Sequence, residues 1–489
     1  MGGLKIAFIT PEAVPFAKTG GLADVSGALP RAVTKQGHSV KLFMPKYRQI
    51  TRQYPGLKRL NIELDIPVGR NNFRGRVFVL PDTEGNPEYY FIDNDYFFDR
   101  EELYRDPATD NDYRDNDERF IFFSRAVLRT LKLLDWRPDI LHANDWQSAL
   151  VPAFLKTEYS LDNFYQGVKS IFTIHNMGYQ GKFPAAAFEK TNLDPALFAA
   201  TGPFEFWGDV NFMKAAIVYS DRITTVSPTY AEEIQNSDEF GKGLQGVLKE
   251  RSRDIVGIIN GVDYTIWSPK RDSQIPHHYF IDNLSGKKKN KLELLHLCNF
   301  PLRIEQPLIG VISRLDIQKG FDLLEDIMDD IMSLDLQFVL LGTGDENYHD
   351  FFNSIEKKYP DRFKAFLTFD NRLAHLIEAG CDIFLMPSRY EPCGLNQMYS
   401  LKYGTVPVVR KTGGLADTVI DFDERNLTGT GFVFEKYDSM ELLAAIRKAV
   451  QLYSRRRIWH KIVKQGMSRD FSWDNSARRY IELYYKLKD

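Results

Sequence analysis

Short apolar runs alternate with amphipathic stretches along the whole chain, and this alternation predicts an α/β fold. Apolar runs bounded by Gly, Pro or Asn are typical of buried parallel strands, and the helical patterns between them supply the crossover connections. In the first half we expect strands near residues 4–10, 40–45, 139–142, 170–175 and 222–226. The second half repeats the rhythm, with strands near 308–313, 338–341, 365–369, 383–387 and 406–409 and helices at 321–332 and 440–453. Two doubly wound, Rossmann-like halves are therefore predicted.

The junction between the halves is expected near residues 260–263, where an Asn-Gly pair marks a turn. We assign residues 1–258 to a first domain and 259–473 to a second, and we expect the C-terminal helix at about 474–489 to pack back on the first. The basic run at 287–291 is interpreted as a solvated helix face near the hinge rather than a polyanion site. The acidic, aromatic stretch 93–117 predicts a long loop leading into a helix at 120–134.

Composition excludes several classes of protein. The 489 residues include 63 Lys and Arg against 66 Asp and Glu, so a formal charge of −3 gives no overall field that favours nucleic acid or anionic membranes. No apolar run approaches the roughly 18 residues of a membrane helix, and the start of the chain lacks a signal-peptide pattern. With 3 cysteines, a disulfide framework is not expected. We therefore expect a cytoplasmic protein that binds neither nucleic acid nor membrane.

One seven-residue segment occurs twice. Residues 18–24 and 411–417 both read Lys-Thr-Gly-Gly-Leu-Ala-Asp, between a predicted strand and a predicted helix. Glycines at that place let backbone approach a ligand closely, and free N–H groups at a helix start can hold phosphate. A tight turn explains either copy taken alone, whereas one copy in each half suggests two loops that face a shared cleft.

Two segments of the second half follow predicted strands, where open α/β sheets bind ligands. In residues 313–320, Arg314 and Lys319 suit a pyrophosphate whose negative charge grows as it departs, although a solvated basic pair fits the spacing equally well. In residues 387–397, Glu391 can accept hydrogen bonds from sugar hydroxyls or favour positive charge at an anomeric carbon, but it also fits an ordinary acid at a helix start. Cys393 has no recognisable base and is interpreted as a packed thiol.

In the first half, residues 142–146 and 173–176 also follow predicted strands, and their polar groups can line the opposite wall of such a cleft. A lone histidine is more often structural than catalytic, so His175 needs independent support. No His or Cys cluster has the spacing of a zinc site. Asp-x-Asp matches at 93–95, 110–112 and 115–117 resemble metal sites of some glycosyltransferases, but three matches in one acidic stretch weaken each of them.

Together these motifs resemble those of the bacterial glycogen synthases and plant starch synthases. The resemblance runs in order from about residue 4 to Trp473 and rests on residues 18–25, 142–146, 173–181, 227–230, 260–263, 313–320, 391–395 and 411–418. It implies the GT-B architecture, in which two Rossmann-like domains face a deep interdomain cleft, with the glucan acceptor on the N-terminal side and the nucleotide sugar on the C-terminal side. The implied reaction transfers glucose from ADP-glucose to the non-reducing 4-OH of an α-1,4-glucan, with retention at the anomeric carbon and without metal or cofactor.

The resemblance also implies which residues form the site. Those assigned to the diphosphate are Lys18, Gly20, Gly21, Arg314 and Lys319. Those assigned to the glucose and the reacting carbon are Asp145, His175, Glu391, Gly394 and Leu395. Of these, the expected catalytic residues are Asp145, His175, Arg314, Lys319 and Glu391.

Three places in the sequence depart from the pattern of the family or of its wider class. Asn144 stands where many bacterial members have His, so no essential role is assigned to it. Residues 369–372 are less acidic than in the family, which leaves their contribution open. Tyr399 occupies the place where related retaining transferases often carry a second Glu, which favours the glycogen synthase branch.

Three alternatives remain open from the sequence. The first is a glucosyltransferase of the same fold that uses UDP-glucose, because no residue identifies the base. The second is a glucan phosphorylase, which needs a pyridoxal phosphate lysine and is usually far longer. The third is a non-catalytic glucan-binding protein. Retention of the proposed diphosphate residues argues against the third alternative, since binding a polymer requires no diphosphate site.

Overall fold

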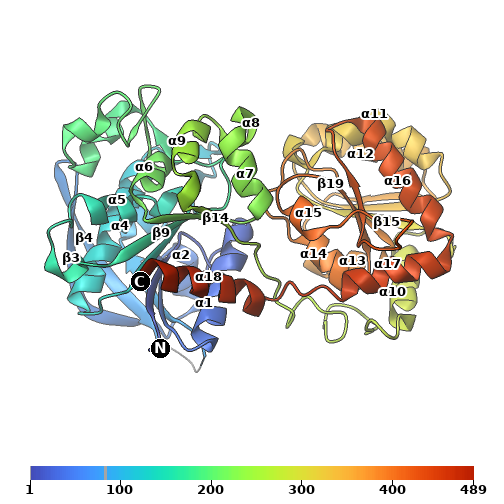
Figure 1. Cartoon of the computed structure of the whole chain (residues 1–489), viewed down its shortest axis with the longest axis horizontal. Coiled ribbons are helices and arrows are strands. Elements are labelled where there is room, and N and C mark those ends of the chain that lie inside the picture. The colour runs from blue at the N-terminus through green and yellow to red at the C-terminus, as the bar shows by residue number, and fades with distance from the viewer. Residues whose placement is uncertain (1, 82–84, 489) are drawn as a thin grey trace. The chain divides into compact units, whose positions relative to one another are not determined.

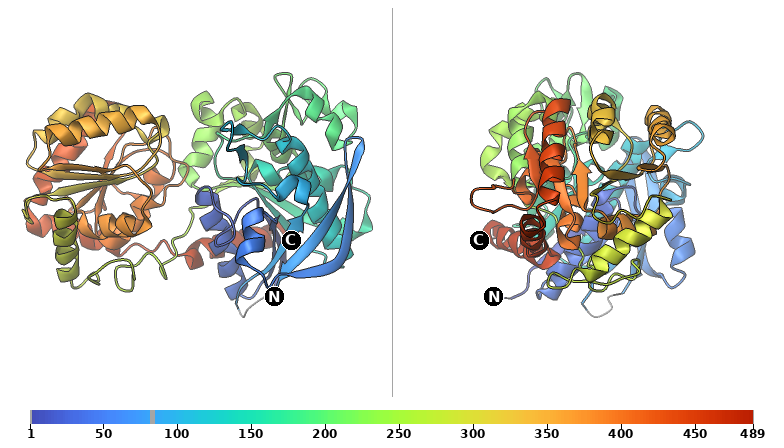
Figure 2. Two further views of the ribbon diagram at one scale, coloured as in Figure 1. Left: turned by 180° about the vertical axis from the view of Figure 1, so that it is seen from behind. Right: turned by 90° about the vertical axis from the view of Figure 1, so that its right-hand side faces the viewer.

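The computed structural model describes residues 2–81 and 85–488. The chain forms two compact units (Figure 1). The first comprises Met1–Val226, Ala231–Gly261 and Trp473–Asp489, and the second comprises Ser227–Tyr230 and Val262–Ser472. Each unit is built on its own sheet, and further views show helices on both faces of each sheet (Figure 2). None of the helices within the described residues is long and apolar enough to cross a membrane.

A nine-stranded sheet forms the centre of the first unit, in the order β14-β13-β9-β8-β1-β2-β5-β4-β3. The parallel strands are β1 (Lys5–Ile9), β2 (Ser39–Pro45), β5 (Glu88–Asp93), β8 (Ile140–Asn144), β9 (Lys169–Ile174), β13 (Arg222–Thr225) and β14 (Ile255–Gly257). The five strands expected in this half are present. An antiparallel extension is formed by β3 (Lys58–Val68) and β4 (Asn71–Leu80). These two strands alternate buried and exposed residues, so they lack the continuous apolar run that marks a strand covered on both faces.

Helices cover this sheet, and the unit also contains several short strands outside it. The helices are α1 (Gly21–Lys35), α2 (Arg48–Gln53), α3 (Asp95–Phe98), α4 (Asn116–Leu133), α5 (Leu150–Lys156), α6 (Phe212–Tyr219), α8 (Asp238–Gly241), α9 (Gln245–Glu250) and α18 (Trp473–Lys488), together with α7 (Pro228–Asn236) from Ala231 onward. The small strands are β6 (Arg105–Asp106), β7 (Asn111–Asp112), β10 (Lys182–Phe183), β11 (Glu205–Phe206) and β12 (Asp209–Asn211). The stretch 93–117 is thus not one long loop, since it contains α3, β6, β7 and the start of α4.

The C-terminal helix α18 is an integral part of the first unit. It packs against α1, and its Tyr484 hydroxyl lies 2.8 Å from Nδ1 of His142 on β8. The other ring nitrogen of His142 lies 2.6 Å from the hydroxyl oxygen of Thr173. Burial lowers the pKa of His142 to about 3 and keeps the ring neutral. The last residues of the chain therefore complete the packing around a central strand.

The second unit contains a six-stranded, fully parallel sheet in the order β17-β16-β15-β18-β19-β20. Its strands are β15 (Leu308–Ile312), β16 (Gln337–Leu341), β17 (Phe363–Phe366), β18 (Ile383–Met386), β19 (Val406–Arg410) and β20 (Phe432–Phe434). Its helices are α10 (Ser285–Leu297), α11 (Phe321–Met332), α12 (Glu346–Lys358), α13 (Asn371–Gly380), α14 (Asn396–Tyr403), α15 (Gly413–Thr418), α16 (Ser439–Tyr453) and α17 (Arg456–Met467). The five expected strands and both expected helices are present, and β20 is added.

The basic run 287–291 is not a uniformly solvated face. It lies on α10, which packs against α13, and the side chains of Lys287 and Lys291 are buried. Lys291 Nζ lies 2.6 Å from the Asp382 carboxylate, and Lys287 Nζ donates to the Thr405 hydroxyl at 2.7 Å. Burial lowers the pKa of Lys287 to about 8. The expectation was wrong for these two lysines because the four-residue spacing places both on the packed face of the helix, where carboxylate, hydroxyl and carbonyl oxygens receive their ammonium groups.

Candidate functional site

The predicted site residues of each unit follow adjacent parallel strands at their carboxyl ends. In the first unit they follow β1, β8 and β9, and in the second they follow β15 and β18. The strand order reverses between β8 and β1 and again between β15 and β18, since the chain continues from β1 to β2 and from β15 to β16 on the opposite side. Such switch points are the places where open α/β sheets bind ligands.

Asp145 joins the loop after β8 to the loop after β9. Its backbone has a φ of 54°, a strained value for a residue other than glycine. Its N–H donates to the carbonyl of Thr173 at 3.0 Å, and its carboxylate accepts the N–H of His175 at 2.8 Å. Burial raises the pKa of this carboxyl to about 7. A strained, buried carboxyl that titrates near neutrality is typical of a functional site.

His175 is held in one tautomer by Asn144. The ring Nε2 lies 3.0 Å from Oδ1 of Asn144, whose amide nitrogen donates to the carbonyls of Ile9 and His142. Because the amide oxygen only accepts, Nε2 of His175 carries the proton and Nδ1 keeps its lone pair. Burial lowers the pKa of His175 to about 3, so the ring is neutral. No essential role was predicted for Asn144, although it is a polar residue beside Asp145 at the end of a buried strand.

In the first copy of the repeated segment, no other described part of the protein fills the space beside the two glycines. Gly20 is the N-cap of α1, and a Cβ added to Gly20 or Gly21 would meet no other described atom within 4 Å. The loop rests on Glu12, whose buried carboxylate accepts the backbone N–H and the hydroxyl of Thr19. Burial raises the pKa of Glu12. The space beside these two glycines is therefore open at the start of the helix, where anions can bind, and Lys18 of the same loop is paired to Asp24 at 2.8 Å.

The second copy serves a different purpose. A Cβ on Gly413 would lie 2.0 Å from the carbonyl oxygen of Glu391, and one on Gly414 would lie 2.0 Å from that of Cys393. The N–H of Gly414 donates to the Glu391 carbonyl at 3.1 Å. These glycines allow the loop after β19 to pack on the loop after β18. The tight-turn interpretation therefore describes this copy, and its glycines support the backbone around Glu391.

Lys319 and Glu391 form an ion pair between the loops after β15 and β18. Gly320 has a φ of 76°, and a Cβ there would lie 2.1 Å from the carbonyl oxygen of Pro387, so only glycine permits this approach. Lys319 Nζ lies 2.7 Å from Oε2 of Glu391, and the side chains are 18% and 9% exposed. The hydroxyl of Ser388 donates to the same oxygen at 3.1 Å. Glu391 is therefore fixed in place, and Ser388 is a further site residue that sequence reasoning missed.

The remaining predicted residues of this unit surround that pair. Arg314 follows β15 and is 64% exposed, with a loose contact of 3.7 Å to Asp316, so its guanidinium has room to reorient toward a ligand. Gly394 has a φ of 70°, and Leu395 is the N-cap of α14. Cys393 is buried and forms no disulfide, as the sequence predicted. The loops after β15 and β18 thus bring a buried ion pair, an exposed guanidinium and a helix start to adjacent strand ends.

Tyr399 lies in an aromatic stack. The ring of Tyr399 lies 4.0 Å from that of Trp267 at an angle of 4°, and the ring of His375 lies 3.7 Å from Trp267 at 10°. Two parallel rings that close to the same indole must occupy opposite faces, since on one face they would overlap. His375 also contacts Asp272 at 2.7 Å. Tyr399 therefore belongs to a packed aromatic cluster.

The acids of the three Asp-x-Asp matches are paired with cations. The pairs are Asp93 with Lys46 and Arg76, Asp95 with Arg76, Asp110 and Asp112 with Arg105, Asp115 with Arg100, and Asp117 with Lys190. Among residues 2–81 and 85–488, no three or more His, Cys, Asp or Glu side chains are grouped so as to hold a metal ion. These carboxylates thus make protein contacts in the described structure.

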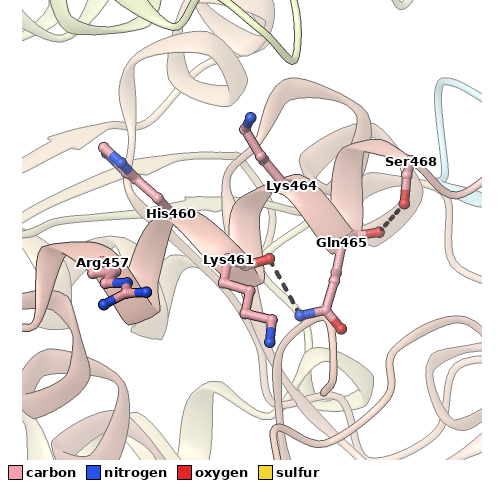
Figure 3. A pocket seen from close by; sticks show the side chains of 6 residues that line it. All are labelled: Arg457, His460, Lys461, Lys464, Gln465 and Ser468. Carbon is pink, nitrogen blue, oxygen red and sulfur yellow. Dashed lines mark hydrogen bonds between the residues drawn. The ribbon is translucent and has the colours of Figure 1, made fainter. Parts of the chain in front are cut away.

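A surface hollow of about 420 Å³ lies on the second unit along α17. Arg457, His460, Lys461 and Lys464 project from this helix, as Figure 3 shows, and Gln465 and Ser468 complete the lining. Lys464 contacts Asp282 at 3.9 Å, and burial together with neighbouring cations lowers the pKa of His460. A second hollow, of about 550 Å³, includes Arg48, Arg100 and Tyr113 in its lining. Neither lining includes a site residue predicted from the sequence, as far as the described residues go.

Comparisons with known proteins place both halves of the chain among glycosyltransferases. Residues 5–250 match the model of the starch synthase catalytic domain, and residues 299–466 match glycosyl transferases group 1. The glycogen synthase of Koribacter versatilis is 46% identical over 487 residues, which cover 99% of this chain and 98% of that protein. The glycogen synthase of Thermotoga maritima is 45% identical over 490 residues, which cover 99% of each chain.

Two solved structures resemble the whole chain. The catalytic domain of starch synthase IV from Arabidopsis thaliana, bound to ADP and acarbose, has a TM-score of 0.88 and 33% identity, and the match covers 100% of both chains. Sucrose-phosphate synthase from Thermosynechococcus elongatus has a TM-score of 0.60 and 18% identity, over 99% of both chains. The second likeness concerns the fold alone.

Proposed function

The chain belongs to the family of bacterial glycogen synthases and plant starch synthases, and on that premise we propose that it transfers glucose from ADP-glucose to an α-1,4-glucan. Its fold is GT-B and its activity is that of a hexosyltransferase, in agreement with the sequence-based predictions. The observation that carries the finer proposal is the Lys319–Glu391 pair of 2.7 Å at the end of β15 and β18. It supplies a cation for a departing diphosphate beside a carboxylate for the sugar.

The second unit is proposed to hold the donor. As the bond between glucose and diphosphate loosens, negative charge gathers on the leaving group and oxocarbenium character on the sugar, as in glycoside cleavage. Lys319 and Arg314 stabilise the first charge, and Glu391 orients the hydroxyls of the glucose and favours positive charge at its anomeric carbon. The backbone N–H groups near Gly394 and Leu395 serve the donor sugar. The choice of ADP-glucose is supported by the starch synthase IV structure, whose bound nucleotide is ADP.

The first unit is proposed to hold the acceptor and to complete the diphosphate site. Neutral His175 offers the lone pair of Nδ1 to a sugar hydroxyl, while Asp145 fixes the loop that bears it. Lys18 and the open backbone at Gly20 and Gly21 bind the diphosphate. The acceptor 4-OH attacks the face that the diphosphate leaves, and the departing phosphate oxygen takes its proton. The configuration at the anomeric carbon is therefore retained.

Lysine and arginine supply the positive charge in this scheme, so we propose that transfer needs no divalent metal. Exhaustive treatment with a chelator is expected to leave the rate unchanged. Loss of activity that a divalent ion restores would contradict this and redirect attention to the acidic segment 93–117. We also place the enzyme in the cytoplasm, a reducing compartment that suits its three buried cysteines, which form no disulfide.

The deciding experiment incubates the purified protein with glycogen and either ADP-glucose or UDP-glucose. The expected result is release of ADP in step with growth of the polymer, and the added residues are expected to be removed by an enzyme specific for α-1,4 linkages. Faster turnover of UDP-glucose would assign the donor differently. Release of glucose 1-phosphate from glycogen and phosphate would indicate a phosphorylase, and glucan binding without nucleotide release would indicate a non-catalytic protein.

A further inference from the structure

A tight turn of the first unit presents an indole ring to solvent. Strands β11 and β12 pair as Glu205 with Val210 and Phe206 with Asp209, so Trp207 and Gly208 form a two-residue hairpin loop. Both loop residues have positive φ, 59° for Trp207 and 89° for Gly208. Trp207 is 85% exposed to solvent. A large apolar ring is therefore displayed at the tip of a turn.

The fold gains nothing evident from tryptophan at this position. A two-residue loop with positive φ at both positions favours Asn-Gly, because a bulky residue is strained in the left-handed region. The indole makes an edge contact with the ring of its chain neighbour Phe206, and the two ring centroids are 6.3 Å apart. Trp207 thus combines backbone strain with exposure of apolar surface. Residues with strained backbone cluster at functional sites, including those that bind ligands.

Hydrogen bonds hold the turn in a fixed shape. The carboxylate of Glu205 accepts the N–H of Gly208 at 2.9 Å and that of Thr201 at 3.2 Å. These bonds, led by the one from Gly208, lower the pKa of Glu205 and keep it ionised near neutrality. Lys214 Nζ lies within hydrogen-bond distance of the Glu205 carbonyl oxygen. The backbone that carries the indole is therefore ordered before any ligand binds.

The turn is attached to the segment that follows His175. Strand β12 also pairs with β10, which lies in that segment, and Asn211 donates to Gln180 at 2.7 Å. Gln180 in turn donates to the carbonyl of Met177 at 3.1 Å. Phe206 packs on Gly243, where an added Cβ would lie 2.8 Å from its ring. The indole and the proposed acceptor histidine are thus carried by one hydrogen-bonded assembly.

We propose that Trp207 is a stacking platform for a glucose ring of the α-1,4-glucan acceptor, remote from the reacting end. The C–H groups of a pyranose form a flat apolar face that matches an exposed indole, and tryptophan provides contact area at little cost in side-chain entropy. A neutral polymer requires no charged partner. This inference rests on the proposed function for the identity of the ligand, and it adds a subsite that the proposed function does not require.

Replacement of Trp207 by asparagine removes the proposed platform and keeps the turn. Trp207→Asn creates the sequence that the turn prefers, so the melting temperature is expected to stay the same or rise. The Kd for maltoheptaose, measured by calorimetry, and the KM for glycogen are expected to rise on the order of tenfold. The KM for ADP-glucose and the kcat at saturating glycogen are expected to be unchanged. Trp207→Tyr should restore most of the affinity, since it returns an aromatic face.

Leu161→Asn is the matched control, because it removes another exposed apolar side chain of the first unit, one that is 94% exposed. It is expected to leave glucan affinity unchanged. Wild-type affinity in Trp207→Asn, an equal loss in Leu161→Asn, a fall in melting temperature, or a change in oligomeric state would each overturn the platform. The proposed function fails separately, if the wild-type protein releases no ADP from ADP-glucose in the presence of glycogen.

Discussion

Lys319 Nζ lies 2.7 Å from Oε2 of Glu391, although the two residues are 72 positions apart in the chain. They meet because β15 and β18 are neighbours in the sheet and because Gly320 lets one loop approach the carbonyl of Pro387. The pair places the cation proposed for the leaving group next to the carboxylate proposed for the sugar. Changes at either residue are therefore expected to affect the other.

Removal of either proposed phosphate cation should slow transfer without unfolding the protein. Arg314→Ala and Lys319→Ala are each expected to lower kcat by at least about 10²-fold, the usual effect of losing one preorganised partner of a developing charge. Steady-state release of ADP gives the rate, and circular dichroism gives the fold. Lys411→Ala is the control, because Lys411 forms an exposed pair with Glu435 in the same unit. Near-normal turnover in both site variants would refute the assignment.

The ion pair should show strong coupling in a double-mutant cycle. Glu391→Gln preserves the shape of the side chain but removes its charge, and it is expected to lower kcat by about 10²-fold. The double variant Lys319→Ala with Glu391→Gln is expected to be little slower than the slower single variant, because each change already disrupts the pair. Fully additive losses in ln(kcat/KM) would mean that the two residues act independently.

Asn144 should control the protonation of His175. Asn144→Asp places an anionic acceptor at the ring Nε2, which favours the imidazolium and raises the pKa of His175 from its value of about 3. A protonated ring loses the Nδ1 lone pair, so the acidic limb of the kcat/KM profile should move to higher pH. Asn144→Ala should lower kcat about tenfold, as loss of a partner that orients a histidine commonly does. Superimposable pH profiles for wild type and Asn144→Asp would contradict this role.

Asp145 should make the first unit less stable as the pH rises toward neutrality. Its folded pKa of about 7 lies above the usual value of 3.8, so between these two values the folded state binds a proton that the unfolded state has released. The free energy of unfolding contributed by this group therefore falls as the pH rises from about 4 to 7. Urea unfolding at about pH 4.5, near the lower end of that window, and at about pH 7.5, just above its upper end, provides the measurement.

Asp145→Asn, which cannot ionise, should gain stability relative to wild type at the higher pH and lose transfer activity. The same comparison for Asp209→Asn, an exposed residue of the first unit, serves as the control. An equal difference between wild type and Asp145→Asn at both pH values would show that the buried carboxyl titrates normally.

Much of the fold could be predicted because each buried parallel strand is marked by a local run of apolar residues. The buried runs at β1 and β15 are apolar on both faces and are visible in the sequence alone. Strands β3 and β4 were missed because they alternate buried and exposed residues. Burial of Lys287 and Lys291 could not be predicted, since it depends on oxygens that distant segments bring to α10.

The candidate site was predicted in part. Strand ends in the sequence pointed to Asp145, His175, Lys319 and Glu391, because ligand-binding loops follow strands in this class of sheet. The supporting contacts of Asn144 and Ser388 came from the structure, since each joins residues of separate loops or fixes a tautomer. The type of each side chain is known from the sequence, but its hydrogen-bond or ion-pair partner depends on which strands become neighbours.

The repeated heptapeptide distinguishes what the sequence determines from what depends on the tertiary structure. The sequence by itself determined that both copies place their glycines between a strand and a helix, because the preferences of these elements are local. Only the tertiary structure decided that the space beside Gly20 and Gly21 is open, whereas Gly413 and Gly414 pack on the carbonyls of Glu391 and Cys393. The physical reason is that glycine permits close approach, while the neighbouring loop determines what approaches.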